Sequence, residues 1–336
     1  MIEHNKPTLG KQEQQAVSKV LESGYVAQGL EVKKFEDEFC DFLGLPEQHA
    51  VALSSGTSAL FVALWSLNAK NKSIAMPVYV CSALRNAVAM AQAKEVLLDN
   101  AVDSPNICLN QLQKSNADIA IVPHMFGLPN EIQNIKDIDI IEDCAQSLGA
   151  SISNKKTGSI GKVGIFSFYA TKLMTSGGQG GMFVSRDKGL VDKVRDYRDF
   201  DCRKDKKHRF NFQMTDVQAS IGRVQLKQLP SFLERRQEIF TMYRESGLDL
   251  LESKNNTPVY YRAVIKVNNP VEIKDKLLKQ GIKTIIPIED WELLDNSSEY
   301  KNAYNLTQTT LSLPIYPSLK NKEIMKIIDE ISKVIK

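Results

Sequence analysis

The sequence lacks the features that mark several large classes of protein. No stretch approaches the roughly 20 consecutive apolar residues that a helix needs to cross a bilayer, and the opening Met1 to Gly10 has no basic segment followed by an apolar one. Low-complexity tracts and internal repeats are missing as well, so a disordered or solenoid architecture is not expected. We therefore predict a cytoplasmic protein without a membrane partner.

Cysteine and unbalanced charge are also scarce. The five cysteines are an odd number without a CxxC pair, which favours reduced, mostly buried thiols over a disulfide framework or a zinc site. The formal net charge is only +3, and its basic residues are scattered except for the run Arg203 to Arg209. The balanced charge predicts no nucleic-acid partner, and the cysteine pattern predicts no metal. The basic run is either a solvated loop or a patch that attracts an anionic substrate.

The order of apolar segments indicates an α/β fold. Helical periodicity covers about Lys11 to Ser23 and Val32 to Leu43, after which short apolar runs alternate with helices. Several runs are continuous, as expected for strands buried on both faces of a largely parallel sheet that helices flank. We expect these strands at about Val51–Leu53, Ile74–Val80, Glu95–Leu98, Ile119–Val122, Ile138–Ile141, Gly164–Phe168 and Met182–Ser185.

The C-terminal part predicts a smaller α+β domain. A long helical pattern from about Thr215 to Ser246, bent or broken near Pro230, leads into it. We therefore predict a large domain over residues 1–245, whose N-terminal segment packs on a small domain over residues 246–336. Within the small domain we expect strands at Val259–Val267, Ile282–Ile288 and Leu311–Ile315, and helices at Val271–Gln280 and from Lys320 onward.

Three features of the large domain carry residue types suited to chemistry. Ser54 to Leu60 (SSGTSAL) lies where a strand turns into a helix, and free N–H groups there suit a phosphate, although such a turn can equally be only a helix cap. The strand Ile138 to Ile141 delivers Glu142 and Asp143 at its carboxyl end, where open α/β sheets bind ligands.

The third feature is a strand that leads to Lys172, followed by a glycine-rich turn at residues 176–181. Each feature alone is weak, because a capping acid and a surface lysine are common. Together they fit one cofactor, because pyridoxal phosphate (PLP) needs a lysine for a Schiff base, a carboxylate on its pyridinium nitrogen and a phosphate seat.

At this point the chain resembles the DegT/DnrJ/EryC1/StrS family of PLP-dependent sugar aminotransferases, which have PLP fold type I. The resemblance runs from Lys6 to Pro317. It is carried by the segment Gly24 to Gly29, Phe35-Glu36, SSGTSAL at 54–60, PHMFG at 123–127, IEDCAQSLGA at 141–150, FSFYATK at 166–172, GGQGGM at 177–182, NFQMTDVQASIG at 211–222 and LSLPIYP at 311–317.

The resemblance implies roles for individual residues. Lys172 and Asp143 are implied as catalytic residues, Lys172 as the Schiff-base lysine and proton carrier and Asp143 as the partner of the pyridinium nitrogen. Gln146 should bind the ring O3′ and Tyr79 should stack on the ring. The phosphate should be held by Gly56, Thr57, Ser58 and Ser167, together with Asn211 from the neighbouring subunit of a homodimer with shared active sites. Substrate contacts are predicted for Tyr25, Gln213 and Tyr316.

The implied activity is transfer of an amino group from glutamate, which leaves as 2-oxoglutarate, through the pyridoxamine form of the cofactor to a keto group of a nucleotide-linked deoxysugar. Such an enzyme serves surface polysaccharide, lipopolysaccharide or amino-sugar biosynthesis. The alternatives are a PLP-dependent sugar dehydratase of the same family and a non-catalytic regulatory protein.

Three positions qualify this interpretation. Gln213 stands where the family commonly has a basic residue, and Ile286 to Trp291 replaces a proline and histidine motif, so substrate recognition is expected to be unusual. His124 is interpreted as a structural histidine, with a functional role as the alternative.

Overall fold

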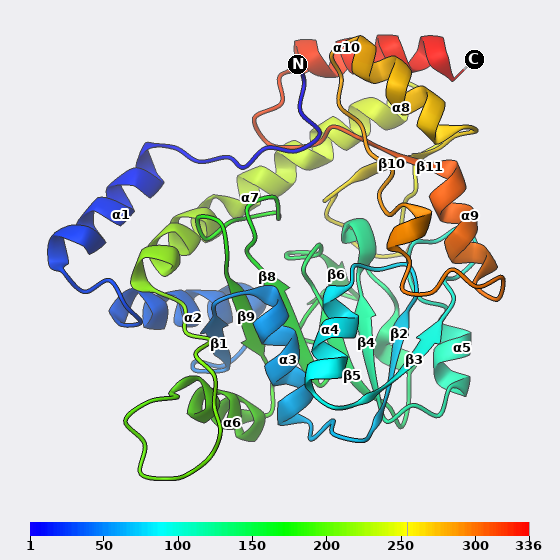
Figure 1. Cartoon of the computed structure of the whole chain (residues 1–336). Coiled ribbons are helices and arrows are strands. Elements are labelled where there is room, and N and C mark those ends of the chain that lie inside the picture. The colour runs from blue at the N-terminus through cyan, green and yellow to red at the C-terminus, as the bar shows by residue number, and fades with distance from the viewer. Residues whose placement is uncertain (254, 336) are drawn as a thin grey trace.

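The computed structural model describes residues 1–253 and 255–335, and in these residues the main sheet has seven strands in the order β1-β9-β8-β5-β4-β2-β3. Strand β9 runs antiparallel to both of its neighbours, and the other pairs of adjacent strands are parallel (Figure 1). The predicted fold class is thereby confirmed. The strands are β1 (Ala50–Leu53), β2 (Ser73–Pro77), β3 (Lys94–Leu98), β4 (Ile119–Pro123), β5 (Asp139–Asp143), β8 (Val163–Ser167) and β9 (Gly181–Val184).

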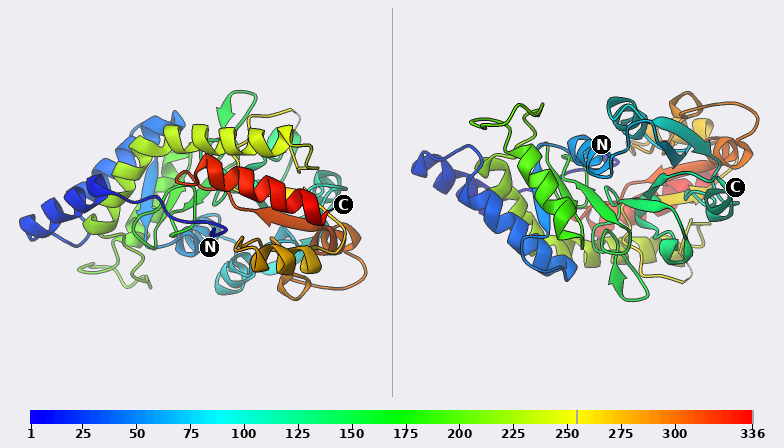
Figure 2. Two further views of the ribbon diagram at one scale, coloured as in Figure 1. Left: turned by 90° about the horizontal axis from the view of Figure 1, so that it is seen from above. Right: turned by 90° about the horizontal axis from the view of Figure 1, so that it is seen from below.

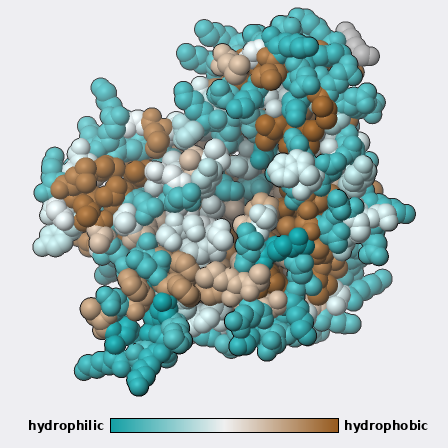
Figure 3. Space-filling view, in the orientation of Figure 1, coloured by the Kyte–Doolittle hydropathy of each residue, from teal (hydrophilic) through white to brown (hydrophobic). Residues whose placement is uncertain are grey.

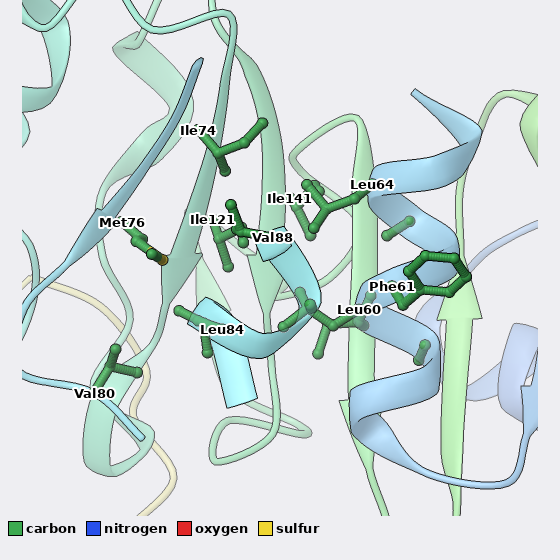
Figure 4. Close-up of a cluster of buried hydrophobic side chains, with 14 of the residues drawn as sticks. Leu60, Phe61, Leu64, Ile74, Met76, Val80, Leu84, Val88, Ile121 and Ile141 are labelled. Atoms are coloured by element: carbon green, nitrogen blue, oxygen red, sulfur yellow. The ribbon is translucent and has the colours of Figure 1, made fainter. Parts of the chain in front are cut away.

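Helices cover the sheet on both sides. The helices of this part are α1 (Lys11–Ser23), α2 (Leu30–Leu43), α3 (Gly56–Ser66), α4 (Ala83–Met90), α5 (Leu109–Lys114), α6 (Lys188–Arg198) and α7 (Asp216–Glu245). On the face turned to the viewer in Figure 1, α3 and α4 pack on the strands. Figure 4 shows how Leu60 and Leu64 of α3, Leu84 and Val88 of α4, and Ile121 and Ile141 of the sheet point into one buried cluster.

The other face of the sheet is packed by aromatic side chains. Phe39 of α2 lies edge-on to Phe166 of β8, with ring centroids 4.9 Å apart, and both residues are fully buried. Leu229 of α7 belongs to the same cluster. The burial of these apolar side chains away from water is the main force that holds α2 and α7 against the sheet.

A smaller cluster forms around the antiparallel pair β10 (Ala263–Lys266) and β11 (Thr310–Leu313). Helices α8 (Pro270–Lys279) and α10 (Asn321–Val334) pack here beside the second half of α7, as Figure 2 shows from above. The N-terminus joins this cluster, because Ile2 N–H donates to the Gly281 carbonyl over 2.7 Å. The division of the chain into two domains at residue 245 stays a prediction.

Several predicted elements are confirmed, and the strand predicted at residues 282–288 is wrong. Helix α1 has the predicted bounds. Helix α7 follows the predicted pattern and continues unbroken through Pro230. Proline has no N–H for the helix hydrogen bond, but the neighbouring Leu229 is fully buried, and its packing holds the helix together. Residues 282–288 form only isolated bridges, because Ile282 pairs with Ile2 and Ile285 pairs with Ser312, and neither pairing extends into a ladder. The structure adds helix α9 (Lys301–Thr309) in a polar stretch for which no helix was predicted.

The hairpin β6 (Ser151–Ile152) and β7 (Lys155–Lys156) and three 3-10 turns, η1 (Met125–Gly127), η2 (Ile132–Asn134) and η3 (Asp290–Glu292), complete the described chain. None of the helices within the described residues is both long and apolar enough to cross a membrane.

Candidate active site

Three adjacent parallel strands end side by side at one edge of the sheet. Strand β4 ends at Pro123, which is paired in register with Asp143 at the end of β5, and β8 ends at Ser167. Parallel strands present their carboxyl ends at the same edge, so the residues that follow them meet in space. A cavity of about 230 Å³ opens here, and its lining includes His124, Asp143 and Lys172.

Asp143 is almost completely buried in this cavity. Its Oδ1 accepts a hydrogen bond from the backbone N–H of Ala145 over 3.0 Å. Burial raises the pKa of the Asp143 carboxyl, and the Ala145 N–H and the positive charge of Lys172 offset this only in part. A protonated pyridinium nitrogen placed against this carboxylate would supply the missing counter-charge.

Glu142, the residue before Asp143, holds the end of β5 in place from the opposite face. Its carboxylate is fully buried and accepts hydrogen bonds from the backbone N–H groups of Gly158, Ile160 and Gly161 over 2.7 to 2.9 Å. His124 Nε2 lies 3.1 Å from the same carboxylate. Cys144 completes a buried trio of metal-ligand type, but four N–H groups already occupy the Glu142 oxygens. We interpret this trio as a structural network that orients Asp143.

Lys172 lies in the loop after β8 and enters the cavity beside Tyr261. Its Nζ is 5.4 Å from the centroid of the Tyr261 ring. The glycine-rich turn supports this loop: Gly178 has a φ of +131°, which favours glycine, and its carbonyl accepts from the Ala170 N–H. The sequence pattern of a lysine between a strand and a glycine-rich turn thus places an amine next to a buried carboxylate.

Gln146 also lines the cavity. Its Oε1 accepts from the backbone N–H of Phe126 over 2.7 Å, which fixes the amide and leaves its NH₂ group to donate. This geometry suits the predicted contact with a phenolic oxygen of the cofactor.

The segment 54–60 forms the beginning of helix α3. Ser55 caps the helix, because its Oγ accepts from the N–H of Ser58 over 3.0 Å, so the capping interpretation of this turn holds as well. Gly56 lies so close to β8 that a Cβ would stand 2.7 Å from the Cβ of Ser167. Two of the predicted phosphate contacts are therefore neighbours at a positive helix end. Thr57 is exposed beside them, and Ser58 turns its buried hydroxyl to the Ser55 carbonyl.

The structure does not support the expected position of Tyr79. This residue is fully buried in the core, edge-on to Phe126 at 6.3 Å between centroids, and it does not line the cavity. Cys81, two residues further along the chain, lines it instead. The chain turns after β2 ends at Pro77, which directs Tyr79 inward and Cys81 toward the cavity.

The other predicted contacts lie apart from the cavity within one chain. Asn211 is exposed, and its Oδ1 accepts from the N–H of Gln213 over 3.0 Å. The segment is fixed beside β1, because Ser54 N–H donates to the Phe212 carbonyl. Tyr25 is 82% exposed between α1 and α2, and Tyr316 is buried in the small cluster, where it does not line the cavity. Tyr316 is therefore a core residue and not a substrate contact of its own chain's cavity.

Sequence reasoning missed the side of the cavity that the C-terminal part supplies. Tyr261 and Arg262 enter from the loop before β10, and Pro287, Ile288 and Glu292 close the cavity from the segment of unusual sequence. The signal that could have found the first two is Tyr-Tyr-Arg at 260–262, where bulky polar residues directly precede an apolar strand.

Comparison with known proteins identifies the family. Residues 7–332 match the DegT/DnrJ/EryC1/StrS aminotransferase family, and the chain belongs to it. The chain is 26% identical to dTDP-4-dehydro-2,3,6-trideoxy-D-glucose 4-aminotransferase of Saccharopolyspora spinosa, over 100% of this chain and 97% of the relative. It is 26% identical to GDP-perosamine synthase of Escherichia coli O157:H7, over 98% and 97%.

A solved structure agrees with these relatives. The aminotransferase TlmJ from Streptoalloteichus hindustanus superposes with a TM-score of 0.92 at 26% identity and covers 98% of both chains. The protein is therefore an enzyme of the sugar aminotransferase family with PLP fold type I, and its cofactor is PLP. The residues fit this cofactor, because an amine, a buried carboxylate and a donating amide open into one cavity.

Proposed function

We propose that this enzyme moves an amino group from glutamate to a keto group of a nucleotide-linked deoxysugar, for surface polysaccharide, lipopolysaccharide or amino-sugar biosynthesis. The observation that carries this proposal is the convergence of Lys172 and Asp143 on one cavity at the carboxyl edge of the sheet. The similarity to aminotransferases whose names specify nucleotide sugars supports the substrate class.

PLP, when bound, supplies an electron sink for the charge that develops when an amino acid loses its α-proton. Asp143 serves this chemistry by holding the ring nitrogen protonated. A buried carboxylate is the right group for that task, because a charge in a low-dielectric site interacts more strongly with its partner than it would in water. The network of His124 and Glu142 keeps the carboxylate in position.

Lys172 has two roles in this proposal. Its amine would hold the cofactor covalently, and when free the same amine would carry the proton that leaves the substrate carbon. The ring of Tyr261 beside Nζ restricts where the freed amine can move. The glycine-rich turn lets the backbone approach without a side chain that would block this exchange.

We also propose that the enzyme is a homodimer in which Asn211 of one subunit joins the phosphate seat of the other. A groove of about 880 Å³ between α1, α2 and α7 supports a second copy as partner. Tyr25, Val26 and Leu30 expose large apolar side chains at this groove, and the brown patch at the left of Figure 3 marks the apolar surface in the area of α1. Exposed apolar surface of this kind is typical of subunit interfaces.

A spectroscopic experiment tests the proposed activity. The purified protein should show the visible absorbance of lysine-bound PLP, and excess L-glutamate should convert it to the pyridoxamine form. A panel of 3-keto and 4-keto nucleotide sugars should then restore the visible band for one member. Absence of the band, or no response to glutamate, would contradict the proposal. A response to sugar without glutamate, with loss of water, would favour the dehydratase.

A further inference from the structure

Arg262 reaches the cavity with a guanidinium group that has no partner of its own. Its Cζ lies 5.4 Å from the centroid of the Tyr261 ring. In the chain as described, residue 254 and the last residue apart, no carboxylate lies within ion-pair distance of this group, and its buried Nε has no hydrogen-bond partner. Buried polar groups are normally satisfied, so this arrangement requires an explanation.

Two buried arginines, Arg198 and Arg236, also have an Nε without a hydrogen-bond partner, but their guanidinium groups are held by protein groups. Arg198 is paired with Glu36. Arg236, which is 1% exposed, donates from Nη1 to the carbonyls of Tyr260, Tyr261 and Ile315 over 3.0 to 3.2 Å. Arg262 differs from both because its charge is directed to a cavity and not to the protein, as expected of a group that binds an anion.

The cavity is lined by two cations, Lys172 and Arg262, and by two acids, Asp143 and Glu292, and Arg262 forms an ion pair with neither acid. Burial acts to raise the pKa of Tyr261, but the positive charges of Lys172 and Arg262, a hydrogen bond with Thr171 and the charge of Arg236 lower this pKa overall, because the ring lies close to these cations. Of the two acidic residues that line the cavity, Asp143 is assigned to the cofactor. Glu292 accepts the N–H of Glu289 with its side chain, in the cap of the 3-10 turn.

Size and position decide which anion fits. The cavity of about 230 Å³ lies below the roughly 300–1,000 Å³ of ordinary ligand pockets, so a nucleotide diphosphate must lie mostly outside it. The amino donor, by contrast, carries its carboxylate within a few bonds of the nitrogen that takes the place of Lys172. Lys172 Nζ and Arg262 Cζ are each 5.4 Å from the centroid of one ring, so they are at most twice that distance apart.

We propose that Arg262 binds a carboxylate of the amino acid that donates the amino group. This inference rests on the proposed aminotransferase function and deepens it. A planar guanidinium matches a carboxylate through two parallel hydrogen bonds, which discriminates an amino acid from a simple amine.

The competing explanation is that Arg262 only packs on the Tyr261 ring, a cation–π contact that needs no ligand. A binding measurement separates the two roles without turnover. Glutarate has the carboxylates of glutamate but no amino group, so its binding to the PLP-loaded enzyme can be followed by calorimetry. Uridine diphosphate serves as a second probe, because it is a nucleotide diphosphate, the class of anion carried by the proposed sugar substrate.

For Arg262→Gln we expect at least a roughly tenfold weaker binding of glutarate, with binding of uridine diphosphate unchanged. Arg262→Lys should lose less affinity for glutarate, and this variant replaces Arg262→Gln in the experiment if Arg262→Gln does not fold. Lys266→Gln is the matched control, because it removes a cation from β10 that is paired with Asp103 outside the cavity. This control should bind glutarate like the wild type.

Three outcomes would overturn the assignment: unchanged glutarate binding in Arg262→Gln, equal losses in Arg262→Gln and Lys266→Gln, or a loss confined to uridine diphosphate. A failure of the proposed function looks different. In that case the wild-type enzyme itself would neither bind glutarate nor be converted by glutamate, whereas a normal wild type beside an unaffected Arg262→Gln variant refutes only the role of the arginine.

Discussion

His124 donates a hydrogen bond from Nε2 to Glu142 over 3.1 Å, directly behind the strand end that presents Asp143. The direction follows from the other ring nitrogen, because Nδ1 accepts the backbone N–H of Asn130 over 3.0 Å and Nε2 must then carry the proton. Adjacent residues of a strand point to opposite faces. Glu142 therefore anchors β5 on one side while Asp143 serves the cavity on the other.

This network makes Glu142→Gln a strongly destabilising substitution. An amide in place of the carboxylate would direct its NH₂ group at two N–H donors and leave buried groups unsatisfied, which costs about 3 kcal/mol of the free energy of unfolding. Denaturation in urea measures this loss. Glu272→Gln, in an exposed pair with Lys276, is the control and should change stability by less than about 0.5 kcal/mol. Equal effects would contradict the structural role of the network.

The positions of the proposed catalytic pair, Asp143 and Lys172, could be predicted from the sequence because each has a local signature. Asp143 ends an apolar strand and Lys172 lies between a strand and a glycine-rich turn, so periodicity places both at the carboxyl edge of the sheet. Arg262 and Glu292 have no such signature. They reach the cavity only because the C-terminal cluster packs beside the sheet, a contact between segments more than 80 residues apart that no local pattern reports.

The misplacement of Tyr79 has a related cause. The motif indicated an aromatic residue after β2, but whether a side chain at a strand end faces the core or a cavity depends on the turn that follows. That turn places Cys81 at the cavity and leaves Tyr79 fully buried. The continuity of α7 through Pro230 was equally hidden, because tertiary packing decides whether a helix tolerates a proline.

The raised pKa of Asp143 predicts a pH-dependent effect of Asp143→Asn on the cofactor-free protein. In the folded state the carboxyl titrates above its ordinary value of 3.8, so the wild-type protein loses stability as the pH rises from that value through the raised pKa. Asparagine does not titrate. Cofactor-free Asp143→Asn should therefore be more stable than the wild type at neutral pH, and the difference should vanish below pH 3.8.

Denaturation of both cofactor-free proteins at several pH values measures this difference. With PLP bound, the same variant should react far more slowly with glutamate, because its amide cannot hold the ring nitrogen protonated. Higher stability together with lower activity would mark Asp143 as a residue kept for function. A difference in stability that does not change with pH would show that folding does not raise the pKa of the Asp143 carboxyl.

Lys172→Ala should abolish both covalent cofactor binding and turnover. The variant loses the amine that holds PLP and the group that carries the proton, so we expect a loss of at least roughly 10³-fold in the rate of reaction with glutamate. Absorbance after borohydride reduction and removal of small molecules measures the attachment. Lys162→Ala, in an exposed pair with Asp139, is the control and should retain the band. Repeated turnover by Lys172→Ala would refute the assignment.

Gly56→Ala should weaken PLP binding through a steric conflict at the phosphate seat. The added Cβ would stand 2.7 Å from the Cβ of Ser167, which pushes α3 away from β8. Adding Ser167→Gly removes the closest contact and leaves the Cα of residue 167 at 3.3 Å, but it also removes a predicted phosphate hydroxyl, so the double variant should regain part of the thermal stability without regaining PLP affinity. Gly10→Ala, whose Cβ would meet no atom closer than 3.7 Å, is the control. Recovered PLP affinity in the double variant would exclude Ser167 as a phosphate contact.

Asn211 provides the test of a shared active site. Within its own chain the side chain accepts the N–H of Gln213 and lies exposed at the surface, so capping this turn is a sufficient role unless a second subunit is present. If Asn211 instead binds the phosphate held by the partner, each site needs Lys172 from one chain and Asn211 from the other. The two roles make opposite predictions for mixed dimers.

In a heterodimer of Lys172→Ala with Asn211→Ala, one site combines the intact Lys172 of the second chain with the intact Asn211 of the first. We expect activity in up to about half of the wild-type sites, although each variant alone is inactive. If Asn211 acts only within its own chain, no site of the mixed dimer contains both residues and no activity returns. Heterodimers purified with two different affinity tags and assayed by the return of the PLP absorbance distinguish these results. Gln48→Ala, at an exposed position outside the proposed interface groove, replaces Asn211→Ala in the control mixture and should give the same half activity by its own intact site.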